Sequence, residues 1–309
     1  MNMYLVMLIG LVCAGAGGEL FVRGTIGLAR AARISPGIIA ATVAAFATSS
    51  PELTVAINSA LAGAPQISLG DALGSNVINV ALILALAVLI APITARRSNV
   101  RRDFPVALLV SVVIGALLVD GHLSRIEGVM LLAGFAVWLV AVALEARSER
   151  SAAPEVLGET RPVRAIVESA IGLALLIAAG NLIVLGATGI AQAFGLSAFV
   201  IGATIVAIGT SVPELATAII SRVRGHDEVG LGTVLGSNIF NGLFIIGVAA
   251  TITPIDVAFV AAAPSLVLGL VAVAITYPPR SGIIDRWRGA MLLAVLAVYL
   301  ASALQGGPE

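Results

Sequence analysis

Two stretches of the chain carry the same group of oxygen-bearing side chains at the same spacing. In the first, ATVAAFATSSPELTVAINS, Thr48, Ser49 and Glu52 stand at positions i, i+1 and i+4 of an expected helix. In the second, ATIVAIGTSVPELATAIIS, the equivalent residues are Thr210, Ser211 and Glu214. Residues four apart on a helix are neighbours, so each stretch brings two hydroxyls and one carboxylate together. Such a group can bind a cation through oxygen.

A proline precedes each of the two glutamates. Pro51 and Pro213 remove a backbone donor and clash with the preceding turn, so each helix is expected to break there. The break frees carbonyl oxygens, which lie at membrane depth only where they line a cavity. Each proline can also begin the next half-helix, which leaves Glu52 and Glu214 in a first turn where the helix dipole favours the ionised carboxylate.

A second repeated motif reads GDALGSNVIN and GTVLGSNIFN, and its serine follows the glutamate by 23 residues in both copies. In the first copy Ser75 and Asn79 share a helix face, and in the second Ser237 and Asn241 do. The helix also carries small residues four apart, which allow close packing against a neighbour. These pairs are Gly70 with Gly74 and Gly232 with Gly236. Close packing would bring Ser75 and Asn79 to Glu52.

The donors in both copies are carboxylates, hydroxyls, amides and freed carbonyls, without histidine or cysteine. Ca²⁺ takes 6–8 oxygen ligands, whereas Zn²⁺ and copper prefer nitrogen or sulfur. His122 and His226 fall in connecting loops, where we interpret both as solvated, and Cys13 is the only cysteine. The sequence therefore predicts a site for a hard cation and no cofactor.

Composition places these motifs in a membrane. The 309 residues are 59% hydrophobic and 11% charged, with a mean hydropathy of +1.09, against about 45–50% apolar residues in soluble domains. The formal net charge is zero, which gives no indication of nucleic acid, and nothing implies a protein partner. A span needs about 20 apolar residues, and ten such stretches are predicted: 3–22, 37–62, 68–92, 104–119, 126–144, 165–190, 197–221, 230–253, 257–277 and 288–304.

The arginines predict which loops face the cytoplasm. Sixteen follow odd-numbered spans, and only Arg125 follows an even-numbered one. Because positive loops stay inside, we expect a multi-pass protein of the cell (inner) membrane with both termini outside. The sixteen are Arg23, Arg30, Arg33, Arg96, Arg97, Arg101, Arg102, Arg147, Arg150, Arg161, Arg164, Arg222, Arg224, Arg280, Arg286 and Arg288.

The chain contains an internal repeat. Residues 35–79 align with 197–241 without a gap, at 21 identical positions of 45. The likeness extends to the first span of each half, which predicts a first five-helix repeat at 1–145, a cytoplasmic linker at 146–164 and a second repeat at 165–309. Five is odd, so the second repeat is inverted, an architecture of transporters that bind ions at the repeat interface. The predicted fold is all-α. Duplication kept only for symmetry would match mostly apolar packing residues, but the matched positions include polar and ionisable residues in mid-membrane, which usually mark ion pathways.

The paired motifs TSSPE with GSNVIN and GTSVPE with GSNIFN resemble the alpha-repeats of the sodium/calcium exchanger family, within the cation/calcium exchanger superfamily. The resemblance covers the whole chain, and it implies alternating access. It also implies that Glu52 and Glu214 hold Ca²⁺ together with the backbone carbonyls of Thr48 and Thr210. Na⁺ sites would use one serine pair in each half, and two asparagines would complete the centre of the site. These residues are Ser49 with Ser75, Ser211 with Ser237, and Asn79 with Asn241.

The sequence departs from that family at two places. Sodium-coupled members commonly carry aspartate at one of the positions of Asn79 and Asn241, so this centre has two carboxylates and no third. Asp71 has Thr233 as its repeat partner, and it is either a vestibule carboxylate or a solvated helix start, of which we favour the second.

The leading hypothesis is an antiporter that exchanges Ca²⁺ for Na⁺. The alternative within the class couples Ca²⁺ or another divalent cation to H⁺. An intramembrane enzyme would need paired aspartates, or serine with histidine or lysine, and no such set is visible. A channel fits inverted halves with broken helices less well than alternating access does.

Overall fold

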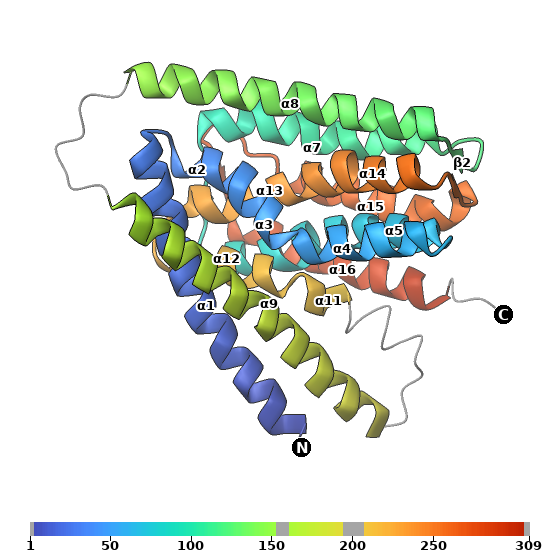
Figure 1. Ribbon diagram of the computed structural model, residues 1–309, viewed down its shortest axis with the longest axis horizontal. Helices are drawn as coiled ribbons and strands as arrows, with labels where there is room; N and C mark the ends of the chain where they lie inside the picture. Colours follow the sequence, from blue (N-terminus) through green and yellow to red (C-terminus); the bar gives the residue numbers. More distant parts are fainter. Residues whose placement is uncertain (1–2, 153–160, 194–206, 306–309) are drawn as a thin grey trace.

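A computed structural model describes residues 3–152, 161–193 and 207–305, which are mostly helical (Figure 1). The helices of the first half are α1 (Met3–Ala32), α2 (Pro36–Ile39), η1 (Ala40–Ala44), α3 (Ala45–Thr48), α4 (Ser50–Leu61), α5 (Pro65–Ile78), η2 (Asn79–Leu84), α6 (Ala85–Ile90), α7 (Arg97–Leu117) and α8 (Arg125–Ala152). Those of the second half are α9 (Pro162–Ala193), α11 (Ala207–Thr210), α12 (Val212–Val223), α13 (Asp227–Ile239), η4 (Phe240–Ile245), α14 (Ile246–Ile252), α15 (Phe259–Thr276) and α16 (Arg286–Gln305). The segments η1, η2 and η4 are π-helical.

Six helices of the described part of the chain are long and apolar enough to cross a membrane. They are Met3–Ala32, Pro65–Ile90, Arg125–Glu149, Pro162–Leu182, Asp227–Ile252 and Phe259–Thr276. A bent pair, Pro36–Thr48 with Ser50–Leu61, adds a seventh if it counts as one span. Helices α7 and α16 cover two more of the predicted stretches, and the stretch at 197–221 lies partly outside the described residues. The count of ten spans therefore stays a prediction.

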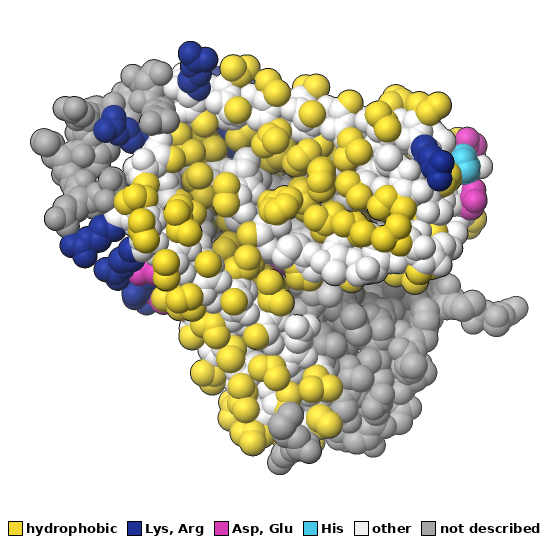
Figure 2. Space-filling model, viewed as in Figure 1, with side chains coloured by type: hydrophobic (Ala, Val, Ile, Leu, Met, Phe, Trp, Pro, Cys, Tyr) yellow, Lys and Arg dark blue, Asp and Glu magenta, His cyan; other side chains and the backbone are white. Residues whose placement is uncertain are grey.

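The surface separates charge from apolar side chains (Figure 2). Hydrophobic side chains cover the middle of the visible face, while arginines gather at the left end and a smaller mixed group of charges lies at the right end. Large apolar side chains of α8 are exposed along its length, such as Ile126 at 76% and Val137 at 71%. A wide apolar band between two charged ends matches the hydrocarbon layer of a bilayer.

Helices α1 and α9 lie side by side at an angle to the other helices (Figure 1). They run antiparallel, because Gly17 meets Leu175 and Leu176 whereas Gly24 meets Ser169. A Cβ added at Gly24 would lie 2.3 Å from the Ser169 hydroxyl oxygen. This close approach is the small-residue packing that membrane helices use in place of hydrophobic association.

Four two-residue strands join the two halves at their ends, which the all-α prediction did not include. Strand β1 (Ile93–Thr94) pairs antiparallel with β4 (Ile283–Ile284), and β2 (His122–Leu123) pairs antiparallel with β3 (Ile255–Asp256). The repeat that aligns 35 with 197 carries β1 onto β3, so the two pairs are equivalent. Two residues are too few to show the alternating pattern by which a strand is recognised in a sequence. These strands form only because each pairs with a strand from the other half.

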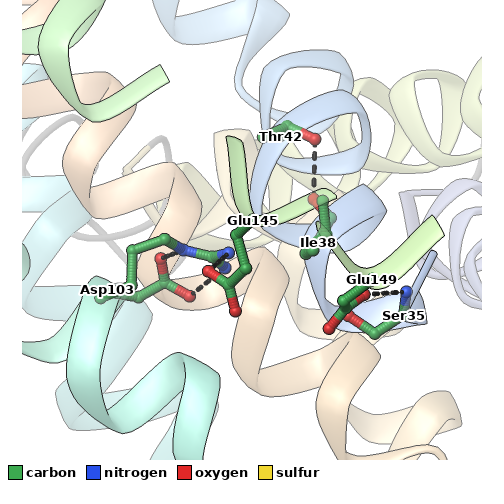
Figure 3. A network of polar contacts seen from close by, with 7 residues as sticks. Ser35, Ile38, Thr42, Asp103, Glu145 and Glu149 are labelled. Atoms are coloured by element: carbon green, nitrogen blue, oxygen red, sulfur yellow. Dashed lines mark hydrogen bonds and ion pairs between the residues drawn. The ribbon is translucent and has the colours of Figure 1, made fainter. Parts of the chain in front are cut away.

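Helix α8 continues beyond the apolar stretch predicted at 126–144 and into the segment predicted as a linker, 146–164. The helix runs to Ala152, since its residues after the apolar stretch are largely good helix formers. Contacts hold this extension (Figure 3): the backbone N–H of Ser35 donates to Glu149 Oε2 at 2.7 Å, and Arg102 bonds Glu145 Oε2 at 2.7 Å. The end of α8 is therefore part of the folded helical body.

Candidate cation site

Both helices that carry the glutamates break where proline predicts it. Helix α3 ends at Thr48 and α4 begins at Ser50, with a bend of 46° between the two halves of the span. Ser49, at the junction, has φ −86° and ψ 13°, and Ser211, at the equivalent junction of α11 and α12, has φ −86° and ψ 9°. The near-identical angles show that both copies of the motif fold in the same way locally.

The two glutamates are buried deep in the protein, each about 1% exposed. Ser49 Oγ donates to Glu214 Oε1 at 3.1 Å, and Ser237 Oγ donates to the same oxygen at 3.3 Å. Serines from both halves therefore meet at one carboxylate. The second oxygen of each glutamate, Oε2, has no hydrogen-bond partner. A buried carboxylate without a counter-charge is costly at membrane depth, so this arrangement suits a cation as its missing partner.

The second motif adds further buried oxygens without partners. Ser75 Oγ, Asn79 Oδ1 and Asn241 Oδ1 are all buried without a hydrogen bond. Asn79 uses its Nδ2 instead, to donate to Asn238 Oδ1 at 3.0 Å. Buried polar atoms are rarely left unpaired in native proteins, so unpaired oxygens on two neighbouring motifs mark a place for a ligand that accepts lone pairs.

Some of the predicted donors already hold hydrogen bonds within the protein. The Thr48 hydroxyl donates to Ala44 O at 3.1 Å, back into its own helix. Pro51 frees the carbonyl of Ala47, but the Ser50 hydroxyl donates to it at 2.8 Å. In the second half, valine stands in place of Ser50 and has no hydroxyl to do this. Thr210 closes α11 and Ser211 is buried beside it.

Two asparagines of the site region were missed. Asn76 Nδ2 donates to Asn238 O at 3.1 Å, and Asn238 Nδ2 donates to Asn76 O at 3.0 Å. The asparagine of the GSN motif is identical in both halves, which could have marked these residues as candidates. They were passed over because each follows the serine directly and so does not share the helix face of Ser75 and Asn79. They bond the two halves to each other directly beneath the π-helical turns that carry Asn79 and Asn241. Such turns often lie at functional sites.

The small-residue packing is confirmed in the second half. A Cβ added at Gly236 would lie 2.3 Å from Ala41 O, and one at Gly232 would lie 2.8 Å from Gly37 O. Helix α13 therefore rests directly on the backbone of α2 and η1. In the first half, a Cβ at Gly74 would lie 2.9 Å from the Tyr299 hydroxyl of α16, and one at Gly70 would meet no described atom within 4 Å. The contacts of Gly232 and Gly236 therefore hold the second copy of the motif against the broken helix of the first half.

The favoured interpretation of Asp71, a solvated helix start, is wrong. Helix α5 begins at Pro65, so Asp71 lies in its second turn, and its Oδ2 is buried without a partner. The predicted stretch starts at residue 68, which placed Asp71 in the first turn, whereas the helix begins three residues earlier, at Pro65.

His122 is exposed, as predicted, but it is not an isolated loop residue. It lies in β2 and its Nδ1 bonds the carboxylate of Asp256 in β3. That hydrogen bond raises the pKa of His122 above its usual value. The pair joins the two halves at the end opposite most arginines.

An apolar helical protein that buries two carboxylates and several unpartnered oxygens at paired helix breaks is, in class, a membrane transporter of cations. The model of the family described as "Sodium/calcium exchanger protein" matches residues 2–144 and 165–305. The chain therefore belongs to the sodium/calcium exchanger family, a family of transporters and not of enzymes.

Individual relatives agree with this assignment. "Inner membrane protein YrbG" of Escherichia coli is 39% identical over 258 residues, covering 80% of this chain and 79% of the relative. "Sodium/calcium exchanger MaX1" of Methanosarcina acetivorans is 24% identical, covering 96% of this chain and 97% of its own. The solved sodium/calcium exchanger from Methanococcus jannaschii superposes with a TM-score of 0.83 at 31% identity, covering 97% of this chain and 98% of that one.

Proposed function

We propose that the chain is a secondary active antiporter that exchanges Ca²⁺ for Na⁺ by alternating access. Membership of the exchanger family supports cation exchange with Ca²⁺. The choice of Na⁺ is supported by the relative MaX1, named a sodium/calcium exchanger. It is also supported by the Methanococcus jannaschii exchanger, whose structures include crystals soaked with Na⁺ and Ca²⁺ or Sr²⁺.

The observation that carries the proposal is the set of unpartnered buried oxygens around two glutamates. Glu52 and Glu214 bind Ca²⁺ through their carboxylates, with the backbone carbonyls of Thr48 and Thr210 as further ligands. Two carboxylates balance the charge of one divalent ion, and oxygen donors suit Ca²⁺. Na⁺ binds at the flanking serines, and the asparagines complete the centre: Ser49, Ser75, Ser211, Ser237, Asn79 and Asn241.

The same hydroxyls support a competition between ions at one place. Ser49 and Ser237 both donate to Glu214 Oε1. A bound cation would replace these hydrogen bonds, because a hydroxyl can turn its lone pairs towards the ion. Binding of Ca²⁺ would therefore turn the serine hydroxyls that Na⁺ also needs as ligands, and binding of Na⁺ would do the same for Ca²⁺. Such competition for shared ligands is what an exchanger requires.

The arrangement in the membrane is part of the proposal. Ten spans form two inverted repeats, 1–145 and 165–309, which is supported by the separate match of the family model to two segments. The equivalent strand pairs that join the halves also favour it. The arginine-rich end faces the cytoplasm and both termini face outside. The inner-membrane name of the E. coli relative supports the same membrane for this chain.

A specific observation favours proton coupling as a second candidate. Asn79 and Asn241 are neutral, so the centre holds two carboxylates, and binding several Na⁺ would leave positive charge in a medium of low dielectric constant. A glutamate that exchanges Ca²⁺ for protons avoids that excess.

Flux measurements separate the two candidates. Purified protein in proteoliposomes is loaded with Na⁺, or given a pH difference at equal Na⁺, and ⁴⁵Ca²⁺ uptake is measured. Sodium exchange predicts uptake only with the outward Na⁺ gradient. Uptake driven by the pH difference alone would instead establish proton coupling, and absence of uptake under both gradients would contradict Ca²⁺ transport.

A further inference from the structure

A long apolar groove lies between α7 and α8, away from the cation site. Its volume is about 900 Å³, and its walls are aliphatic side chains, with Trp138 and Leu243 deep inside. The two helices lie side by side in Figure 1, yet they have few direct contacts with each other. Exposed Leu109 (57%) and Val137 (71%) stand at the opening, so the groove opens towards the surrounding lipid.

Arginines stand at one end of this groove. Arg97, Arg101 and Pro105 lie four residues apart, on the same stripe of α7 as Leu109 and Val113. Both guanidinium groups are exposed, and neither has a hydrogen bond or ion pair within the described ranges. Two positive charges can therefore bind an anionic group at the end of the apolar groove that lies among the arginines.

The neighbouring Arg102 behaves differently and closes the groove at that end. Its Nε and Nη2 bond both oxygens of Asp103 at 2.7 and 2.9 Å, and its Nη1 bonds Glu145 of α8 at 2.7 Å (Figure 3). This network ties α7 to α8. Glu145 is the acidic side chain among the groove-lining residues, and it is paired with Arg102, not with Arg97 or Arg101, within the described residues.

We propose that this groove binds one phospholipid with an anionic headgroup. Its phosphate lies between Arg97 and Arg101, since guanidinium groups match phosphate geometry with paired hydrogen bonds. Basic pockets between membrane helices are sites for anionic headgroups. This site is independent of the exchange function.

The dimensions of the groove fit an acyl chain. A bilayer leaflet contributes about 15 Å of hydrocarbon, half of the roughly 30 Å core, which corresponds to about ten helical residues at 1.5 Å each. A chain that starts beside Arg101 thus reaches about as far as Val110, within the groove. Opposite, Gly134 leaves the wall open, because a Cβ there would meet only Leu243 Cδ2 at 3.9 Å.

The floor of the groove connects it to the transport helices. Leu243 belongs to η4, the π-helical segment that also contains Asn241. Val110 of α7 packs against the same segment, at Gly242. A bound acyl chain therefore touches the segment that carries a central residue of the cation site, without reaching the ions themselves.

Tryptophan fluorescence tests the proposal directly, because the chain has only two tryptophans. In Trp287→Phe, all tryptophan emission comes from Trp138, which lines the groove. The protein is reconstituted in phosphatidylcholine vesicles, and phosphatidylglycerol or phosphatidylcholine with brominated chains is titrated in. We expect brominated phosphatidylglycerol to quench at lower mole fraction than brominated phosphatidylcholine.

Variants separate the headgroup contacts from the chain contacts. Arg97→Gln and Arg101→Gln should each weaken the preference for phosphatidylglycerol by about fivefold, and both together by about 25-fold. Arg125→Gln, at the other end of α8, is the control and should change nothing. Gly134→Leu should fill the groove and reduce quenching by both lipids, whereas Ala133→Leu, its exposed neighbour, should not.

Three outcomes would overturn the proposal. Equal quenching by the two lipids would show that the headgroup is not recognised, and an unchanged preference in the double arginine variant would place the recognition elsewhere. Efficient disulfide crosslinking of Val137→Cys between two molecules in a Cys13→Ser background, together with weak quenching by both lipids, would show that a second copy of the chain covers the groove.

Discussion

Asn76 and Asn238, which are equivalent residues of the two halves, each donate their side-chain amide to the other's backbone carbonyl, at 3.1 and 3.0 Å. The reciprocal bonds satisfy two carbonyls at membrane depth and join α5 to α13 beside the cation site. Asn238 also accepts from Asn79. The two halves are thus held together next to the candidate cation site.

This relationship predicts unequal effects of two similar substitutions. Asn76→Ala leaves Asn238 O without its donor and should destabilise the protein by about 1–3 kcal/mol. Asn238→Ala also strands the Asn79 amide, so its loss should be larger, about 2–5 kcal/mol. Thermal unfolding in detergent measures both, with exposed Asn58→Ala as the control. A Tm for Asn238→Ala equal to that of Asn58→Ala would contradict the importance of the pair.

The glutamates and their serine predict graded losses of transport. Glu52→Gln and Glu214→Gln should each abolish ⁴⁵Ca²⁺ flux while the protein still folds, because each removes half the charge that faces a divalent ion. Ser49→Ala removes one charge-assisted hydrogen bond, about 1.5–3 kcal/mol, and should change the apparent ion affinity about 10-fold to 100-fold. Thr54→Ala, whose hydroxyl only bonds back to its own helix, is the matched control. Normal flux in either glutamine variant would remove that glutamate from the site.

The charge at the centre predicts the coupling ratio. With neutral Asn79 and Asn241, the site should tolerate less total cation charge than a three-carboxylate exchanger, since excess charge is costly in a low-dielectric cavity. We expect Asn241→Asp to raise the Na⁺ to Ca²⁺ ratio, measured from the membrane potential at which net Ca²⁺ flux reverses. If the unmodified protein already exchanges three Na⁺ per Ca²⁺ and the variant does not differ, charge at this position does not set coupling.

Asp71 is tested in the same assay, because it lies one turn before Ser75 on α5 and its Oδ2 is buried without a hydrogen-bond partner. If its charge contributes to the site, Asp71→Asn should lower the affinity for Ca²⁺ and shift the reversal potential in the direction opposite to Asn241→Asp. If the Ca²⁺ affinity and the reversal potential of Asp71→Asn are both unchanged, Asp71 takes no part in the cation site.

The His122 and Asp256 pair predicts a pH dependence of stability. The hydrogen bond to Asp256 raises the pKa of His122 in the folded protein. A raised pKa stabilises the fold fully below the unfolded value, about 6.5, and the contribution disappears as pH rises through the folded value. The Tm should therefore fall above about pH 6.5, and His122→Gln should flatten that part of the profile. An identical profile for His122→Gln would show that the pair does not stabilise the junction.

Sidedness predicts a labelling pattern. In a Cys13→Ser background, Ala62→Cys should react with an impermeant maleimide from outside, and Ser148→Cys only from inside. Both residues are exposed, at the end of α4 and near the end of α8. Reversed labelling would invert the proposed orientation.

The sequence by itself determined the helix breaks, the paired glutamates and the membrane setting. These follow from local chemistry: Pro51 and Pro213 stand in the first turn of the second half of each broken helix, a position that suits proline, and apolar stretches of span length need lipid. Proline alone is not enough, because Pro105 and Pro264 lie inside continuous helices. The 21 identities between residues 35–79 and 197–241 also indicated Ser75, Asn79 and their repeat equivalents, Ser237 and Asn241, as candidate site residues. Because each copy repeats the other, the sequence indicated which residues matter without indicating what they touch.

Only the tertiary structure decided which of these residues meet. Ser49 bonds the glutamate of the other half, Asn76 reaches across to Asn238, and the Thr48 hydroxyl turns back to its own helix. These choices depend on how closely α13 approaches η1 at Gly236 and on the two-residue strands that pair across the halves. Such contacts join residues distant in the chain, so no local pattern records them. The groove between α7 and α8 is of the same kind, since it exists only where two helices fail to close upon each other.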